Sequence, residues 1–394
     1  MPRHRLTVLF GLFLAAIALR PQIIAVGPLL PAIRRELGVS HAVAGLLGTI
    51  PVLCMGVFAP SAVGLAARFG TRAAIGVSVA LIGAAGLVRV ATADPVVLLL
   101  FTFPVGVGIA IAGTLMPMAV KERFPHRPAF ATSVYTLGIQ IGAAGSAAVA
   151  VPLSHALSGY RGSLAVVSLA AVAIAGGWFL LSGGVERRAE VKRARLPLRS
   201  PTAWLLVLIF SVIGIVYYGL SAWLGAAYQE HGWSESRAGL LLTVIQAVTV
   251  PTVVVMAFVG DRVPSRRLFL SGATLLMFGG LLGVVLAPGG GWAYAAMFGV
   301  GIGVTFSMLM TLPLDVADDP AQVGAAAGMM MGLGYTISAV SPFALGAVRD
   351  ATGSFTDSLW LLVAMEVVLF AAVALGLTRE RLRRGAKHVA RTGG

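Results

Sequence analysis

The sequence predicts an all-α membrane protein in which twelve transmembrane helices form two six-helix halves. Three observations predict this fold class: the apolar composition, the recurrence of apolar runs long enough to cross a bilayer, and the placement of Lys and Arg between those runs. Hydrophobic residues make up 58% of the 394 residues and charged residues only 11%, whereas soluble globular proteins contain about 25% charged residues. Most of the protein surface is therefore expected to contact membrane lipid.

A spanning helix needs roughly 17–25 mainly apolar residues, and runs of that length recur along the whole chain. The predicted spans are 7–31, 42–66, 73–92, 96–119, 129–152, 162–182, 203–227, 237–259, 267–287, 292–313, 322–347 and 357–378. The first run lacks a small-residue cleavage pattern and is followed at once by further runs. We therefore expect a membrane helix there and not a removable signal peptide.

The basic residues are divided unequally between the two sides of the membrane. With the N-terminus in the cytoplasm, the outer gaps hold only Arg34, Arg35, Arg161, Arg237 and Arg349. Apart from Arg20 and Arg89, which lie inside predicted spans, all other Lys and Arg fall on the cytoplasmic side, as the positive-inside rule requires. This predicts a multi-pass protein of the plasma (inner) membrane with both termini cytoplasmic. No basic patch accompanies an exposed aromatic platform, so the net charge of +14 does not indicate a nucleic-acid partner.

A polar stretch and an internal repeat divide the chain. We expect an N-terminal half over 1–182, a cytoplasmic linker over 183–202, a C-terminal half over 203–378 and a basic cytoplasmic tail over 379–394. One constant offset pairs several polar and glycine positions of the two halves: Gly38 with Gly232, Ser40 with Ser234, Thr49 with Thr243, Arg68 with Arg262, and Arg72 with Arg266. Such a parallel repeat is typical of transporters whose binding site lies between the halves near the membrane midplane.

Several kinds of chemistry are excluded by what the sequence lacks. The single cysteine, Cys54, allows no disulfide and no cysteine metal cluster within one chain. The histidines fall in predicted loops, tails or helix ends, and no metalloprotease, nucleophile-elbow or nucleotide-binding motif occurs. We therefore predict a monomeric protein that is not an enzyme and has no metal or cofactor.

The loop at residues 64–72, GLAARFGTR, resembles the signature loop of the major facilitator superfamily, and the stretch at 260–267, GDRVPSRR, resembles its degenerate second copy. The resemblance implies the major facilitator fold and a cytoplasmic gate to which Arg68, Arg72, Asp261 and Arg262 contribute. Ala67 stands where the first copy normally has Asp, which weakens the gate on that side. From the residues alone, these arginines could equally bind helix-end carbonyls or only enforce topology.

The start of the chain resembles one branch of that superfamily. Arg20-Pro21 followed by VGPLLP at residues 26–31 is similar to the first helix of cyanate and nitroimidazole transporters. The resemblance implies a secondary transporter that moves a small anionic or nitrogen-containing solute by alternating access. The competing prediction is a proton-coupled drug or metabolite efflux antiporter, since the glycine-rich run at 138–145 resembles an antiporter motif without its Gly-Pro pair.

Arg20 is the residue most indicative of a binding site. An arginine near the middle of a spanning helix costs roughly 2.5–3.5 kcal/mol, so its guanidinium should face a polar cavity or a partner. Pro21 cannot donate a backbone hydrogen bond and leaves the Ile17 carbonyl without its helical partner. Arg20 could tie helix 1 to a neighbouring helix, or it could bind a small oxyanion, carboxylate or cyanate-like ion through parallel hydrogen bonds.

Other polar residues in predicted spans complete the set of candidates. Solute contacts are expected from Tyr135, Gln140, Tyr217, Tyr218, Gln246 and Tyr335, with Trp223 and Thr336 nearby, although each could instead serve helix packing. Glu366 is the candidate for proton coupling, with a structural role as the alternative. Arg89 is expected to reach the membrane surface or to pair with Asp94. Glycines at 106, 108, 113, 299, 301 and 303 are expected to allow close helix packing.

Overall fold

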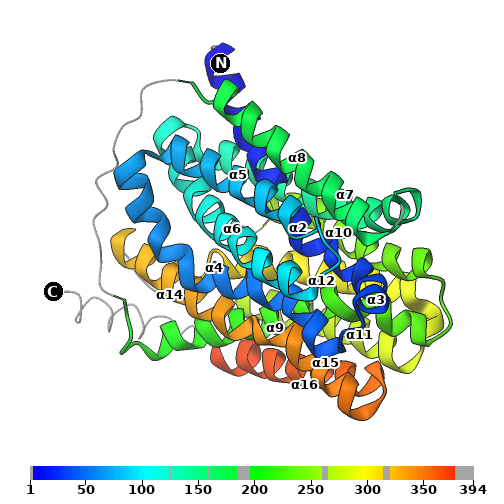
Figure 1. Ribbon diagram of the computed structural model, residues 1–394. Coiled ribbons are helices and arrows are strands. Elements are labelled where there is room, and N and C mark those ends of the chain that lie inside the picture. The colour runs from blue at the N-terminus through cyan, green and yellow to red at the C-terminus, as the bar shows by residue number, and fades with distance from the viewer. Residues whose placement is uncertain are drawn as a thin grey trace.

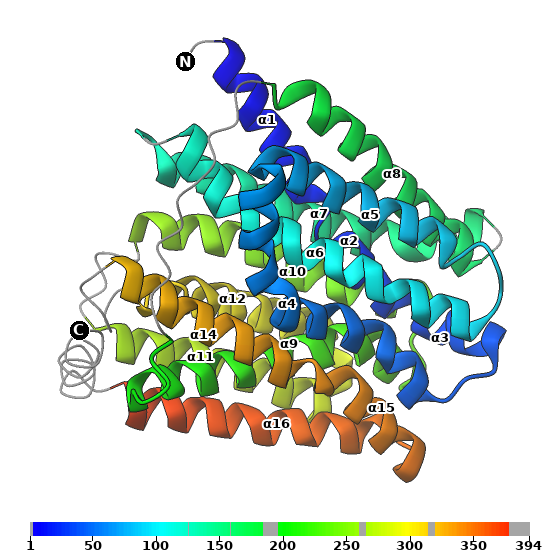
Figure 2. The same cartoon turned by 60° about the vertical axis from the view of Figure 1, so that its left-hand side comes forward.

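The computed structural model describes residues 3–124, 126–157, 159–183, 196–259, 265–313 and 320–377. In these ranges all regular structure is helical, and twelve helices are long and apolar enough to cross a membrane (Figures 1 and 2). The predicted number of spans and the all-α fold class are therefore confirmed. Residues 184–195, 260–264 and 378–394 fall outside the described ranges. Most of the predicted linker, Asp261, Arg262 and the basic tail therefore lie outside the described residues.

The N-half, defined as α1 to α8, contains the first six spans. Its helices are α1 (Arg3–Ile17), α2 (Pro21–Ile24), α3 (Val26–Leu37), α4 (His41–Phe69), α5 (Thr71–Val88), α6 (Pro95–Arg123), α7 (Pro128–Ala156) and α8 (Tyr160–Leu181). The C-half, defined as α9 to α16, contains the other six. Its helices are α9 (Pro201–Glu230), α10 (Glu235–Val259), α11 (Arg266–Leu286), α12 (Gly291–Leu309), α14 (Pro320–Ser338), α15 (Val340–Thr352) and α16 (Phe355–Ala371), with a short 3-10 turn at Pro288–Gly290 and a π turn at Ala372–Gly376.

Two predicted spans are divided by breaks. The first, 7–31, is broken after Ile17, because Pro21 has no N–H for that carbonyl and starts a new helix. It is divided again at Ala25, between α2 and α3. Gly142 of α7 packs against the exposed Ile17 carbonyl, where a side chain would not fit. The eleventh, 322–347, is interrupted at Ala339 between α14 and α15. Some helices also run past their apolar core: α6 continues to Arg123, four residues beyond the predicted end at 119.

The repeat detected in the sequence has the same backbone geometry in both halves. Gly38 and Gly232 adopt φ of 65° and 81°, a left-handed conformation that glycine adopts at little cost. Two residues later, Ser40 Oγ accepts from the Val43 N–H at 3.2 Å, and Ser234 Oγ accepts from the Arg237 N–H at 3.4 Å. Each half therefore starts its second span with the same turn and the same serine cap.

Glycines allow close packing inside each half, as predicted. A Cβ atom at Gly106 of α6 would lie 2.7 Å from Pro51 Cα of α4, and one at Gly299 of α12 would lie 2.7 Å from the Ile245 carbonyl of α10. Gly108, Gly301 and Gly303 are similarly close to neighbouring helices, whereas Gly113 has only Leu19 at 4.0 Å. In both halves a glycine lets the backbone of one helix approach the backbone of its neighbour. The helices that carry these glycines, α6 and α12, occupy corresponding places in the two halves.

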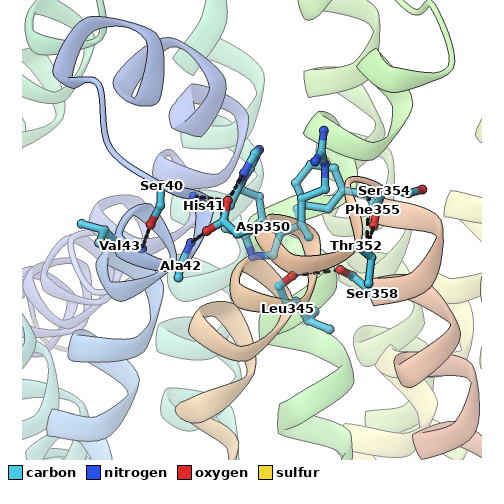
Figure 3. A network of polar contacts seen from close by, with 12 residues as sticks. Ser40, His41, Ala42, Val43, Leu345, Asp350, Thr352, Ser354, Phe355 and Ser358 are labelled. Carbon is cyan, nitrogen blue, oxygen red and sulfur yellow. Dashed lines mark hydrogen bonds and ion pairs between the residues drawn. The ribbon is translucent and has the colours of Figure 1, made fainter.

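The two halves meet mainly along four helix pairs. In the described residues α4 packs on α14 and α15, α7 packs on α10, and α3 packs on α9 (Figures 1 and 2). At the end of the bundle where α3 and α15 lie, Asp350 of α15 reaches the first turn of α4 (Figure 3). Its Oδ1 accepts from the His41 N–H at 3.0 Å and lies 2.6 Å from His41 Nδ1, while its Oδ2 accepts from the Ala42 N–H at 2.8 Å.

A second charged contact and a short polar contact support this junction. Arg35 of α3 lies 3.2 Å from Glu235 of α10, and the Phe343 N–H of α15 donates to Thr49 Oγ1 of α4 at 3.3 Å. Hydrogen bonds therefore join α4 to α15 at the Asp350 end of the bundle.

Candidate substrate-binding site

Arg20 lies at the break between α1 and α2 and reaches across to the C-half. Its Nη1 donates to the Tyr218 hydroxyl of α9 at 2.8 Å. Although it is in the middle of the bundle, Arg20 remains partly exposed. A side chain that is surrounded by helices and still accessible faces an internal space, so Arg20 lines the interface between the halves.

Three tyrosines gather around the guanidinium. The hydroxyls of Tyr217, Tyr218 and Tyr335 all interact with Arg20 electrostatically. The Tyr218 ring lies 5.2 Å from the Tyr217 ring and 6.4 Å from the Tyr335 ring, measured between centroids. Phe210 packs edge-on against Tyr335 at 4.9 Å. The resulting wall is aromatic, with its hydroxyl groups directed to one cation.

Gln246 of α10 belongs to the same cluster. Its Nε2 donates to the Tyr217 hydroxyl at 3.1 Å. Five of the seven predicted solute-contact residues are therefore brought together, from helix 1, α9, α10 and α14. The five residues are Arg20, Tyr217, Tyr218, Gln246 and Tyr335.

The charge of Arg20 is not neutralised by any described residue. Its recorded partners are tyrosine hydroxyls, and no carboxylate of the described ranges pairs with it. A guanidinium has several N–H donors, of which one is used by Tyr218, so donors remain for a ligand. A partly buried cation between apolar helices favours an anionic partner, and the planar guanidinium matches a small oxyanion or carboxylate. The site can therefore hold a small anion against an aromatic wall.

The remaining solute-contact candidates are not placed in this cluster. Tyr135 and Gln140 lie on α7 and are partly exposed, and the Tyr135 hydroxyl interacts with Thr136. Trp223 is buried and donates from Nε1 to the Pro342 carbonyl at 2.7 Å, which fixes α15 on α9. Thr336 donates to the Gly332 carbonyl within its own helix at 2.8 Å.

Glu366 lies in α16, away from the tyrosine cluster. It is fully buried, and neither carboxyl oxygen has a hydrogen-bond partner in the described residues. Because α16 packs on α9 and α11, Glu366 belongs to the interior of the C-half and not to the interface between the halves. No group of three or more His, Cys, Asp or Glu that could hold a metal occurs in the described ranges.

The prediction for Arg89 was wrong. Arg89 is fully buried and donates from Nη2 to Gln22 Oε1 at 2.5 Å, so it neither reaches the surface nor pairs with Asp94. Asp94 instead caps α6 by accepting from the Val96 and Val97 N–H groups. The sequence analysis also missed Gln22. A glutamine inside an apolar run, directly after Arg20-Pro21, is the signal that could have revealed this contact.

The signature-loop arginines differ in their contacts. Arg72 donates from Nε to Ser182 Oγ at 3.0 Å and from Nη2 to the Phe179 carbonyl at 2.6 Å, which ties the start of α5 to the end of α8. Arg68 is exposed, with its guanidinium carbon 5.3 Å from the Phe69 ring centroid. Arg72 thus satisfies a helix-end carbonyl within the N-half.

Two broken helices, a parallel repeat and a charged site between two six-helix halves define a polytopic membrane transporter. The Major Facilitator Superfamily profile matches residues 8–342, and the chain belongs to this family of transporters. Its relatives include the uncharacterized transporter YycB of Bacillus subtilis (strain 168), which is 30% identical over 94% of this chain and 93% of that protein. The 2-nitroimidazole transporter of Escherichia coli (strain K12) is 29% identical over 96% of this chain and 97% of that protein.

The cyanate transport protein CynX of Escherichia coli (strain K12) is 30% identical over 93% of this chain and 96% of that protein. A solved bacterial homolog of the human lysosomal transporter Spinster, in an inward-facing and unoccupied conformation, has a TM-score of 0.73 at 17% identity. That likeness covers 100% of this chain and 96% of the other. The structural likeness supports the fold, and the family establishes that this protein is a transporter and not an enzyme.

Proposed function

We propose that the protein is a secondary active transporter that moves a small anionic or nitrogen-containing solute, of the size and charge of cyanate, across the inner membrane. The observation that carries this proposal is Arg20, a partly exposed guanidinium between the halves without a carboxylate partner among the described residues. An anion would supply the missing negative charge. The names of relatives that transport cyanate and 2-nitroimidazole support the same class of solute.

Alternating access follows from the position of the site. Arg20 belongs to the N-half and its hydrogen-bond partner Tyr218 to the C-half, so relative movement of the halves changes the site and its accessibility together. The positive-inside distribution supports an orientation with both termini in the cytoplasm and the Asp350 end of the bundle outside. In this orientation the outer side is closed by α4 and α15, and the solute would reach Arg20 from the cytoplasm.

The membrane potential determines what the transporter must couple to. An inside-negative membrane opposes entry of one anion by roughly 2.3 kcal/mol per 100 mV, so accumulation of an anion needs a co-transported cation. Glu366 is the candidate for carrying a proton, because it is a fully buried carboxyl group without a hydrogen-bond partner in the described residues. Export of the anion would need no such group.

A second candidate function is proton-coupled efflux of an aromatic or apolar compound. The wall formed by Phe210, Tyr217, Tyr218 and Tyr335 favours it, because aromatic rings stack on flat apolar solutes. The uncompensated charge of Arg20 disfavours it, since a neutral solute would leave that charge unpaired.

A solute screen on purified protein distinguishes the two functions. A ligand that binds only the folded state stabilises it by RT ln(1 + c/Kd), where c is the ligand concentration, so the melting temperature rises as c exceeds Kd. We expect cyanate or nitrate to stabilise the wild type and not the Arg20→Gln variant. Stabilisation of both proteins by neutral aromatic compounds alone would refute anion transport.

A further inference from the structure

Arg89 is a buried cation that contacts Gln22 of α2, next to the break between α1 and α2. It caps the C-terminal end of α5 and has no exposed surface. Its Nη2 donates to Gln22 Oε1 at 2.5 Å and lies 3.5 Å from the Gln22 carbonyl, while Nη1 lies 3.5 Å from Thr102 Oγ1. Its Nε has no hydrogen-bond partner among the described residues. All of its partners in the described residues are neutral oxygens, so the full positive charge remains.

A neutral side chain could make the same link at lower cost. Burying a charge without a counter-ion is strongly unfavourable, and a hydrogen bond to an amide oxygen does not cancel it. The helix packing around Gln22 therefore does not by itself explain an arginine at this position. What distinguishes an arginine at this position is the charge itself, which acts over a longer range than a hydrogen bond.

Gln22 connects Arg89 to the candidate site. Gln22 follows Arg20 by two residues, so the two side chains leave the short helix α2 and its N-cap in nearly opposite directions. Gln22 is fully buried, and its Nε2 donates to Ser168 Oγ of α8 at 2.9 Å. A Cβ at Gly86 would lie 2.9 Å from Gln22 Nε2, so the glycine makes room for this side chain. Arg89 thus stands one side chain behind Arg20, on the face away from the interface.

We propose that Arg89 is a second determinant of anion selectivity, which raises the positive potential at Arg20 without touching the solute. This inference rests on the proposed anion transport. The surroundings of Gln22 and Arg89 are apolar helices, where charges are screened much less than in water. The neutral Gln22 positions Arg89 and leaves its charge uncancelled.

The substitution Gln22→Glu tests this directly. It keeps the size of the side chain and the acceptor for Arg89, but it places a carboxylate against the guanidinium and cancels its charge. The expected result is a rise in the Kd for cyanate on the order of tenfold with no loss in melting temperature. Arg89→Met should give a similar rise, and Arg89→Lys, which keeps the charge, should remain near the wild-type Kd.

Ser168→Ala is the matched control, because it removes the other hydrogen bond of Gln22 without changing any charge. Wild-type cyanate affinity is expected in this variant. If Ser168→Ala weakens cyanate binding as much as Gln22→Glu does, the role of Gln22 and Arg89 is structural and the inference fails. Unchanged cyanate affinity in Gln22→Glu also overturns the inference about Arg89. If Arg20→Gln loses cyanate binding in the same experiments, the proposed function stands. A wild type that binds no cyanate would overturn both.

Discussion

The carboxylate of Asp350 is predicted to stabilise the closed state of the outer side. Replacing it by Asn keeps the size and one acceptor oxygen, but removes the charge and places an NH₂ group against a backbone donor of α4. Hydrogen bonds to a charged group contribute about 1.5–3 kcal/mol each, and Asp350 accepts from the His41 and Ala42 N–H groups and from the His41 ring. Because the Asp350 side chain is 30% exposed, water replaces part of what is lost.

We therefore expect Asp350→Asn to destabilise the closed outer side by about 2 kcal/mol, which is roughly a thirtyfold change in the ratio of closed to open molecules. Spin labels at His155→Cys and Ala287→Cys would report this ratio. Both positions are exposed at the Asp350 end of the bundle, which we expect to be the outer end, one in each half. The only native cysteine, Cys54, is buried and can be replaced by Ala.

Distance distributions from double electron–electron resonance should show a longer-distance population that grows in Asp350→Asn. Asp357→Asn is the matched control, since Asp357 is exposed at the same end and forms no side-chain hydrogen bond or ion pair among the described residues. If Asp350→Asn leaves the two populations as in the wild type, the contact with α4 does not stabilise the closed state and the reasoning is refuted.

Three further predictions concern the helix break, the coupling residue and the topology. Pro21→Ala returns a backbone donor worth up to about 3 kcal/mol of helix stability, so α1 and α2 should join into a straighter helix. Turnover in proteoliposomes should fall while the melting temperature does not. Wild-type turnover in this variant would show that the break is incidental. Glu366→Gln should impair accumulation of solute much more than counterflow exchange, and equal effects on both would make Glu366 structural. A cysteine that replaces the exposed Leu196 should not react with a membrane-impermeant reagent in intact cells, whereas one that replaces Asp357 should react. The reverse pattern would show that the topology is the opposite of the predicted one.

The fold could be predicted largely from the sequence because each membrane span is a continuous stretch of the chain. Length and apolarity identify each span, and the loop arginines predict its direction. The break at Arg20-Pro21 was predictable for the same reason, since a missing N–H has a local effect. The second break, at Ala339, was not predicted, although Pro342 three residues further on leaves the Ser338 carbonyl without its helical donor in the same way.

The site was predictable only in part because it depends on which helices face one another. Tyrosines at 217, 218 and 335 were singled out as polar groups in apolar runs, but their convergence on Arg20 depends on the packing of the halves. The contact of Asp350 with α4 joins residues 308 and 309 positions apart, and no local pattern reveals it. Arg89 was misplaced because its partner, Gln22, lies on another helix.

The central claim is that Arg20 binds the transported anion. Counterflow of isotope-labelled cyanate in proteoliposomes, measured with the membrane potential set to zero, tests it without depending on the coupling ion. The wild type should exchange cyanate, and Arg20→Gln should reduce the exchange to the level of empty liposomes. The control Arg237→Gln removes an exposed arginine stacked on Trp233 and should exchange cyanate like the wild type. Undiminished cyanate exchange by Arg20→Gln would contradict the claim.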